Sequence, residues 1–254
     1  MTHIRKYYEF INENEDIRLT YNQNHDPIDK IDQKYAQIIE YTNLKTGITK
    51  EDVNKLIKEA EFNNFYGVCV PPDMVDHAVY TLTDPSKLKV ISVIDFPNGD
   101  DTISNKLLQA NELISNGVNE IDMVMDYGLF KKAYLKGDKD LQKSLYEKIE
   151  NEINIISNEC HKNGVILKII IETSELTIDQ ISKVCEIIVR TGADYIATST
   201  GTKVKGYEIE KIKEIVRYSG EYVKVKVMGG VRSIEDLQKL YPYVDRIGTS
   251  KILK

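Results

Sequence analysis

The sequence predicts a (β/α)₈ TIM barrel, a closed ring of eight parallel strands with a helix after nearly every strand. Short apolar segments of strand character alternate with segments of helical period along the chain. About eight such units fit into 254 residues, a length that α/β barrels commonly reach as one domain. No Gly-x-Gly-x-x-Gly follows the first strand, which weakens the alternative of an open dinucleotide-binding sheet.

The strands are expected where β-branched and apolar residues cluster between turn signals. In chain order they cover residues 38–42, 68–70, 89–95, 119–125, 165–172, 195–199, 222–228 and 245–248. Regular alternation with helices implies parallel strands joined by right-handed crossovers. We expect residues 34–254 to form a single barrel domain and residues 1–33 to form an N-terminal helical extension outside it.

Two capping boxes mark the starts of helices. In such a box, a Thr side chain and an acid or amide three residues later satisfy free backbone N–H groups. The segment 49–52 begins the helix after the first strand, and the segment 177–180 begins the helix after the fifth. A further helix is expected over residues 106–114, and one long charged helix between the fourth and fifth strands.

Composition restricts the class of partner. The net charge is −6, whereas a surface for nucleic acid or an anionic membrane needs clustered Lys and Arg. The N-terminal residues are too polar for a signal peptide, and no apolar run approaches a membrane span. Cys69, Cys160 and Cys185 form no Cys-x-x-Cys pair and are not spaced as metal ligands with a histidine. We expect a cytoplasmic protein without a metal or an organic cofactor.

Charged residues on three strands are the first candidates for a catalytic site. Side chains alternate between the two faces of a strand, so Lys224 and Lys226 share the inward face of the seventh strand, with Lys226 nearer the mouth. The same alternation turns Lys168 and Asp122 inward. Burying a charge costs several kcal/mol unless it is paired or used. One acid and two bases on three strands therefore favour a functional group over a purely structural ion pair.

Glycine-rich turns follow the last three strands. The candidate ligand contacts are Thr200 and Gly201 after the sixth strand, Gly229 and Gly230 after the seventh, and Gly248 and Ser250 after the eighth. Loops after the seventh and eighth strands of this fold commonly hold phosphate with free N–H groups. Three such loops side by side predict a small phosphorylated ligand.

Six stretches of the chain, in order, resemble the deoxyribose-phosphate aldolase family. They are F-Y-G-V-C-V-P-P (65–72), V-I-D-F-P-N-G (93–99), N-G-V-N-E-I-D-M-V-M (116–125), L-K-I-I-I-E-T-S-E-L-T (167–177), T-G-A-D-Y-I-A-T-S-T-G (191–201) and V-K-V-M-G-G-V-R (225–232). The resemblance implies a class I aldolase. Such an enzyme reversibly cleaves 2-deoxy-D-ribose 5-phosphate to glyceraldehyde 3-phosphate and acetaldehyde through a lysine Schiff base. It also implies a homodimer and a small phosphorylated sugar or aldehyde as partner.

The resemblance also implies roles for single residues. Asp122 falls on the family's proton-shuttling aspartate, and Lys226 falls on the lysine that lowers the pKa of the nucleophile. Lys168 falls on the remaining polar partner from the fifth strand, and the glycines of the three turns fall on the phosphate loops. The Schiff-base lysine itself falls on Ala197. Alanine has no amine, so it cannot form an imine.

Ala197 leaves several hypotheses open. In the first, Lys226 on the next strand replaces the nucleophile, and Lys168 lowers the pKa of Lys226 as a like charge. In the second, the protein binds a sugar phosphate without turnover. In the third, the barrel catalyses a different lyase, deaminase or isomerase reaction. Engineered removal of the lysine is a further hypothesis, but Glu40 and Tyr41, where the family has Asp and His, favour natural divergence. Cys69 at a strand end is expected to be a small buried hydrophobe rather than a nucleophile.

Overall fold

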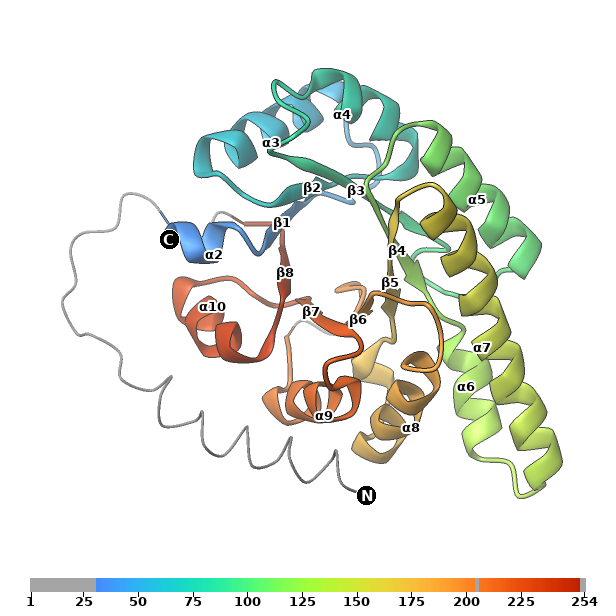
Figure 1. The fold of residues 1–254 in the computed structure, drawn as a ribbon. Coiled ribbons are helices and arrows are strands. Elements are labelled where there is room, and N and C mark those ends of the chain that lie inside the picture. The colour runs from blue at the N-terminus through green and yellow to red at the C-terminus, as the bar shows by residue number, and fades with distance from the viewer. Residues whose placement is uncertain (1–30, 204–205, 252–254) are drawn as a thin grey trace.

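The computed structural model describes residues 31–203 and 206–251, and its strands close into a barrel. The strands pair in parallel and in sequence order, with β8 against β1, and helices surround the ring (Figure 1). They are β1 (Ile39–Thr42), β2 (Gly67–Cys69), β3 (Lys89–Ile94), β4 (Glu120–Val124), β5 (Ile166–Ile170), β6 (Tyr195–Ala197), β7 (Lys224–Met228) and β8 (Arg246–Thr249). The predicted (β/α)₈ fold is confirmed, and the predicted strands coincide with the observed ones to within two residues at each end.

One short helix precedes β1, and the other helices occupy the connections between the strands. In chain order they are α2 (Gln33–Ala36), α3 (Lys50–Asn63), α4 (Val75–Thr81), α5 (Ile103–Ser115), α6 (Tyr127–Tyr134), α7 (Lys139–Lys162), α8 (Ile178–Ile188), α9 (Ile209–Ser219) and α10 (Ile234–Leu240), with short 3₁₀ turns η1 (Pro72–Met74), η2 (Thr173–Glu175) and η3 (Tyr241–Tyr243). Thr49 and Thr177 form the two predicted capping boxes, and Ser233 forms a third at the start of α10.

The long charged helix expected between β4 and β5 is α7, and the shorter helix α6 precedes it in the same connection. The chain breaks around Gly137, a residue that disfavours a helix interior. Asp138 then starts α7, since its side chain accepts hydrogen bonds from the backbone N–H groups of Asp140 and Leu141.

The predicted extension, residues 1–33, lies outside the described residues except for its last three, and it stays a prediction. Within the described part of the chain, no helix is both long and apolar enough to cross a membrane.

The strands separate two buried layers. On β4, Ile121 and Met123 belong to the large apolar core between strands and helices, whereas Val124 belongs to a separate cluster inside the barrel. On β5, Leu167 and Ile169 face the helices while Ile170 faces the lumen. This alternation is the pattern of a parallel barrel covered on both faces, and it fixes which side chains meet in the lumen.

Candidate active site

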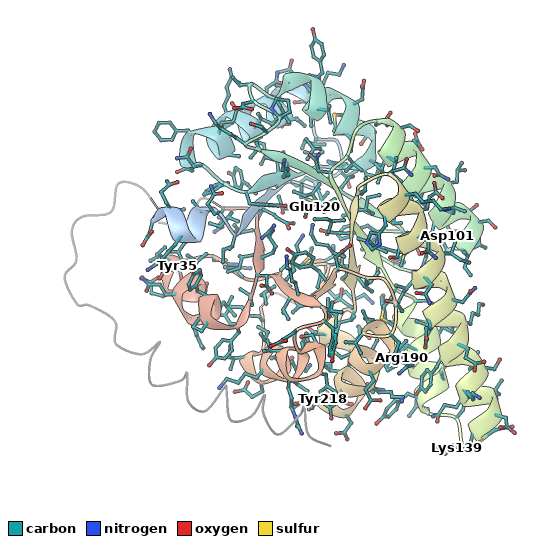
Figure 2. All side chains as sticks on the ribbon, viewed as in Figure 1. Tyr35, Asp101, Glu120, Lys139, Arg190 and Tyr218 are labelled. Atoms are coloured by element: carbon teal, nitrogen blue, oxygen red, sulfur yellow. The ribbon has the colours of Figure 1, made fainter. Side chains whose placement is uncertain are left out.

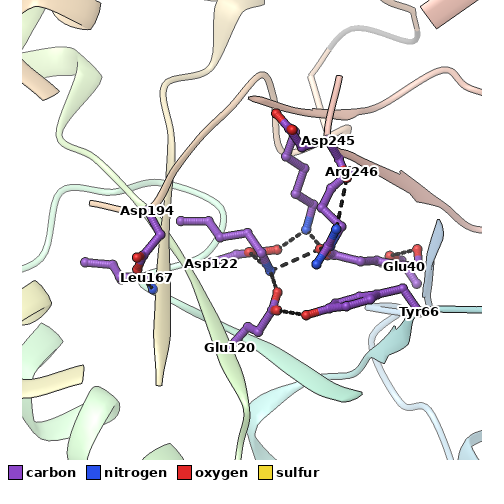
Figure 3. A network of polar contacts seen from close by, with 11 residues as sticks. Glu40, Tyr66, Glu120, Asp122, Leu167, Asp194, Asp245 and Arg246 are labelled. Carbon is purple, nitrogen blue, oxygen red and sulfur yellow. Dashed lines mark hydrogen bonds and ion pairs between the residues drawn. The ribbon is translucent and has the colours of Figure 1, made fainter. Parts of the chain in front are cut away.

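Six charged side chains meet inside the barrel and form a buried layer, which we call the charged layer. Its members are Glu40 on β1, Glu120 and Asp122 on β4, Lys168 on β5, Lys226 on β7 and Arg246 on β8. Figure 3 shows four of them by label, with their contacts to the two lysines and to Tyr66. The predicted trio of Asp122, Lys168 and Lys226 is therefore brought together, in a larger group than expected.

Lys168 lies at the centre of three carboxylates. Its Nζ lies 2.5 Å from an oxygen of Glu120 and 3.1 Å from oxygens of both Glu40 and Asp122. The side chain is completely buried. Burial alone would lower the pKa of Lys168, but the three carboxylates raise it well above its ordinary value. Lys168 is therefore a cation.

Lys226 lies beside two carboxylates of the same layer. Its Nζ lies 2.5 Å from Oδ2 of Asp122 and makes a close contact with Glu40. Burial lowers the pKa of Lys226, and Lys168 lowers it further, yet Asp122 and Glu40 outweigh both and leave it raised. Lys168 thus lowers the pKa of Lys226, as expected for a like charge, but the net pKa of Lys226 is raised and not lowered.

Glu40 is the carboxylate that both lysines share. Burial tends to raise its pKa, but Lys168 and Lys226 lower it to about 2. The neighbouring Tyr41 points the other way, into the layer between strands and helices, where its hydroxyl donates to Glu59 at 2.9 Å. Glu40 and Tyr41 are the two residues of the first strand that differ from the family pattern. Glu40 belongs to the charged layer, and Tyr41 does not.

The lower side of the charged layer was missed from the sequence. The Tyr66 hydroxyl donates to Glu120, and the guanidinium of Arg246 lies 3.4 Å from the centre of the Tyr66 ring. The Nε of Arg246 is 3.8 Å from Glu40. Glu120 lies two residues before Asp122, so the same alternation identifies it as inward-facing. The layer holds three carboxylates against three cations, a balance that a buried ionic group requires.

An apolar layer covers the charged layer on the side of the strand ends. It consists of Val124, Ile170, Ala197 and Met228, with Phe96 and Tyr127 packed against them. Val124, Ile170 and Met228 each lie two residues after a member of the charged layer, hence one step closer to the mouth. We call this group the apolar cover.

Ala197 occupies a defined place in that cover. Its Cα pairs with Ile170 of β5 on one side and with Lys226 of β7 on the other. The alanine is fully buried. The position that the family resemblance assigns to the nucleophile is therefore apolar here, and the residue in register with it on β7 is Lys226.

The glycine turns after β6 and β7 approach each other closely. Gly201, Gly229 and Gly230 all have positive φ, a conformation that favours glycine. A Cβ on Gly201 would lie 3.4 Å from Cα of Gly229, and a Cβ on Gly229 would lie 3.3 Å from Cα of Gly201. Ser250, directly after β8, is exposed. The turns predicted to hold phosphate thus form a tight backbone rim at the strand ends.

Gly248 has a packing reason of its own. A Cβ at this buried position would lie 3.1 Å from Cβ of Met228 and 3.5 Å from Cε of Lys226. The glycine therefore leaves room for Met228, whereas the Lys226 side chain would be at an ordinary contact distance.

Thr200 is held by a buried carboxylate. Its hydroxyl and its backbone N–H both donate to Oε2 of Glu172, at 2.6 and 3.0 Å. Glu172 itself has a positive φ of 52°, and its other oxygen accepts from Ser174 at 2.7 Å. Thr200 thus shapes the turn, and its polar groups are already engaged.

A cavity of about 510 Å³ opens beside this rim. It is bordered by the loops after β1, β2 and β3 and by Thr202, with Phe96 in its wall. Cys69 lies below, fully buried, and burial raises the pKa of its thiol. A buried thiol with a raised pKa suits the expected role as a small hydrophobe. Among the described residues, no group of three His, Cys, Asp or Glu is placed to hold a metal ion.

Comparisons with known proteins agree with this geometry. The model of the DeoC/LacD family aldolases matches residues 28–241. A deoxyribose-phosphate aldolase from Caldicellulosiruptor saccharolyticus is 37% identical over 219 residues, covering 86% of this chain and 94% of the relative. One from Thermococcus kodakarensis is 37% identical over 224 residues, covering 87% and 95%.

Solved structures give the same result. An aldolase named QR15 superposes with a TM-score of 0.75 at 31% identity, covering 88% of this chain and 92% of that one. The deoxyribose phosphate aldolase from Aeropyrum pernix, described as tetrameric, has a TM-score of 0.73 at 26% identity, covering 88% and 90%. The barrel, the charged layer and these relatives lead to one conclusion: the chain belongs to the DeoC/LacD aldolase family.

Proposed function

We propose that this protein cleaves 2-deoxy-D-ribose 5-phosphate reversibly to glyceraldehyde 3-phosphate and acetaldehyde, with Lys226 as the amine that forms the imine. The names of its relatives and the membership in an aldolase family support the reaction. The observation that carries the assignment of the amine is the register of Lys226 with Ala197 on the adjacent strand. Neighbouring strands lie about 4.8 Å apart, so a substrate that reaches position 197 is close to the Lys226 side chain.

Imine formation needs an uncharged amine, and Asp122 is the group that can accept the proton of Lys226. The two groups are 2.5 Å apart. Because the pKa of Lys226 is raised, the resting amine is protonated, and proton transfer to Asp122 has to accompany binding of the carbonyl. The amine then adds to the carbonyl carbon, Asp122 returns its proton to the departing hydroxyl, and loss of water gives the iminium. Asp122, ionised again, takes the proton of the 3-hydroxyl as the C2–C3 bond breaks and glyceraldehyde 3-phosphate leaves. It then returns this proton to C2 of the enamine, and water hydrolyses the resulting iminium to acetaldehyde and the free lysine.

The binding part of the proposal concerns the rim. Gly201, Gly229, Gly230 and Ser250 would hold the phosphate through backbone N–H groups and the serine hydroxyl, since free amides at strand ends suit an anion. Thr200 and Gly248 would act as positioning residues, through Glu172 and through Met228 of the apolar cover.

Borohydride trapping tests the amine directly. The protein is incubated with acetaldehyde or 2-deoxyribose 5-phosphate, reduced, and analysed by peptide mass mapping. We expect a stable adduct on Lys226 and none in Lys226→Met. Lys143→Met, at an exposed lysine of α7, serves as the control and should label as the unsubstituted protein does. Absence of any labelled lysine in a folded protein contradicts the proposal.

A second candidate function is binding of a sugar phosphate without cleavage. The observation in its favour is that Lys226 is fully buried beneath the apolar cover and held by two carboxylates. A parallel assay of retro-aldol cleavage by the natural chain and by Ala197→Lys separates the two candidates. Activity in both, lost in Lys226→Met, supports Lys226 as nucleophile; binding by both with cleavage only by Ala197→Lys supports the second candidate.

The assembly and location expected from the sequence belong to the same proposal. We infer a cytoplasmic homodimer, although a relative in another organism is described as tetrameric. Light scattering of the purified protein gives the molar mass, and a mass other than that of two chains contradicts the dimer.

A further inference from the structure

A second large cavity lies at the opposite end of the barrel from the glycine rim. Its volume is about 1040 Å³, and it opens where α2, the end of α10 and η3 meet the first residues of β7 and β8. We call it the basal cavity. Tyr35 of α2, labelled in Figure 2, packs edge-on against Tyr241 of η3, with ring centres 4.9 Å apart. In this fold the N-terminal strand ends are remote from the catalytic mouth, so the cavity is separate from the proposed active site.

Positive charge is concentrated in this cavity. Among the described residues that line it are Lys34, Lys224, Lys239 and Arg246, with Asp245 as the one carboxylate, in a chain whose net charge is −6. That carboxylate accepts the backbone N–H of Val225 at 2.9 Å and joins β7 to β8. The local excess of cations thus opposes the overall charge of the chain, which is typical of an anion site.

Three of these cations, Lys224, Lys239 and Arg246, carry the argument. The fourth, Lys34, pairs with Asp32 at 3.3 Å, so its charge is partly used. Lys224 lies on the predicted inward face of β7, and it is exposed because β7 begins there. Lys239 comes from the last turn of α10. The Nζ of Lys224 lies 5.6 Å from the ring centre of Tyr195, and the Nζ of Lys239 lies 5.9 Å from that of Tyr207. Neither lysine pairs with a carboxylate among the described residues.

Arg246 connects the basal cavity to the charged layer. Its Nη1 donates to the carbonyl of Asp245 at 3.0 Å, and its buried Nε makes no hydrogen bond within the described chain. A guanidinium presents five N–H donors in a planar fork that matches phosphate oxygens. Stacking on Tyr66 holds that fork in one orientation at the cavity wall.

We propose that the basal cavity binds a small molecule that carries a polyphosphate group and an aromatic ring, the chemistry of a nucleoside polyphosphate. Lys224, Lys239 and Arg246 would contact the phosphates, and the rings of Tyr241 and Tyr243 would pack against the base. A single phosphate would leave most of the volume empty, whereas drug-sized ligands occupy pockets of roughly 300–1000 Å³. The inference is independent of the reaction proposed above.

Calorimetric titration of the full chain tests this site. ATP, pyrophosphate and adenosine are titrated at low ionic strength into the natural protein, Lys224→Ala/Lys239→Ala and Lys55→Ala/Lys143→Ala. The last variant removes the same charge at exposed lysines of α3 and α7. We expect ATP to bind more tightly than pyrophosphate, adenosine to bind weakly, and the first double variant to lose at least about tenfold in ATP affinity, with no change in the control variant.

Three results overturn the proposal. ATP and pyrophosphate fail to bind the natural protein, both double variants weaken binding equally, or binding persists in Lys224→Ala/Lys239→Ala. The last result would assign the phosphate to the glycine rim. Equal affinity for ATP and pyrophosphate would overturn the role of the aromatic ring.

Discussion

Buried lysines pair with carboxylates in two regions of this protein, one inside the ring of strands and one outside it. One is the charged layer of the lumen, with Lys168 and Lys226. The other lies outside the strand ring, where Lys106 of α5 pairs with Asp95 at 3.2 Å and with Glu152 of α7 at 2.7 Å. All three lysines are fully buried.

The difference is in what else the ammonium groups contact. Lys106 also donates to the backbone carbonyls of Gly99 and Val124, at 3.0 and 3.3 Å. Fixed carbonyls hold this lysine in one place, and through it the loop after β3, from which Phe96 reaches the apolar cover. Both groups pair lysine with carboxylates, but Lys226 is in register with Ala197, the position that the family resemblance assigns to the nucleophile. Burial and pairing with carboxylates alone therefore do not distinguish the two groups.

The largest effect is expected for Lys168→Met. The variant leaves Glu40, Glu120 and Asp122 without their shared cation, and removing one partner of a buried ion pair typically costs about 3–5 kcal/mol. We expect at least this loss in the free energy of unfolding, measured by urea titration with circular dichroism at neutral pH. Lys143→Met, on the surface of α7, is the control. A loss below about 1 kcal/mol would contradict the ionic account of the layer.

Lys106→Met is expected to have a smaller effect, about 2–3 kcal/mol, because the side chains of Asp95 and Glu152 are 9% exposed and can be partly hydrated, unlike the carboxylates of the charged layer. Burial already raises the pKa of Glu152, against the influence of Lys106, so this carboxylate can become protonated in the variant. We also expect faster proteolytic cleavage of the loop between β3 and α5, followed by mass spectrometry. A variant with intact loop protection would show that Lys106 does not hold the loop.

The sequence was sufficient for the fold and for half of the charged layer. Period-two alternation identified Lys168, Lys226 and Asp122, and it applies equally to Glu120. It does not show that Lys224 is exposed, because this depends on the position of the residue at the start of the strand, where the barrel opens to solvent. Arg246 stands on a segment of four residues, too short for a periodic signal.

The charge state of Lys226 was beyond prediction from one sequence. It depends on Glu40, which lies on another strand 186 positions away along the chain, and on the sum of opposing effects of burial, two carboxylates and a second lysine. Alternation shows which side chains face the lumen. It does not show how close the tips of side chains from β1, β4 and β7 come to each other.

The smallest effect, and the sharpest contrast between the two groups, is expected in the pH dependence of Glu40→Gln and Glu152→Gln. The pKa of Glu40 is lowered from 4.5 to about 2, so its ionised form contributes stability above pH 4.5 that is lost as the pH falls towards 2. The pKa of Glu152 is raised, so its contribution to stability is present below pH 4.5 and is lost as the pH rises through the folded-state pKa.

Urea unfolding of the natural protein and both variants from pH 3 to pH 7 measures these contributions. The cost of Glu40→Gln should shrink towards acid pH, and the cost of Glu152→Gln should shrink towards neutral pH. Parallel curves for the two variants would show that the lumen and the outer cluster hold their carboxylates in the same way, and the distinction between a reactive and a structural lysine group would then lose its physical basis.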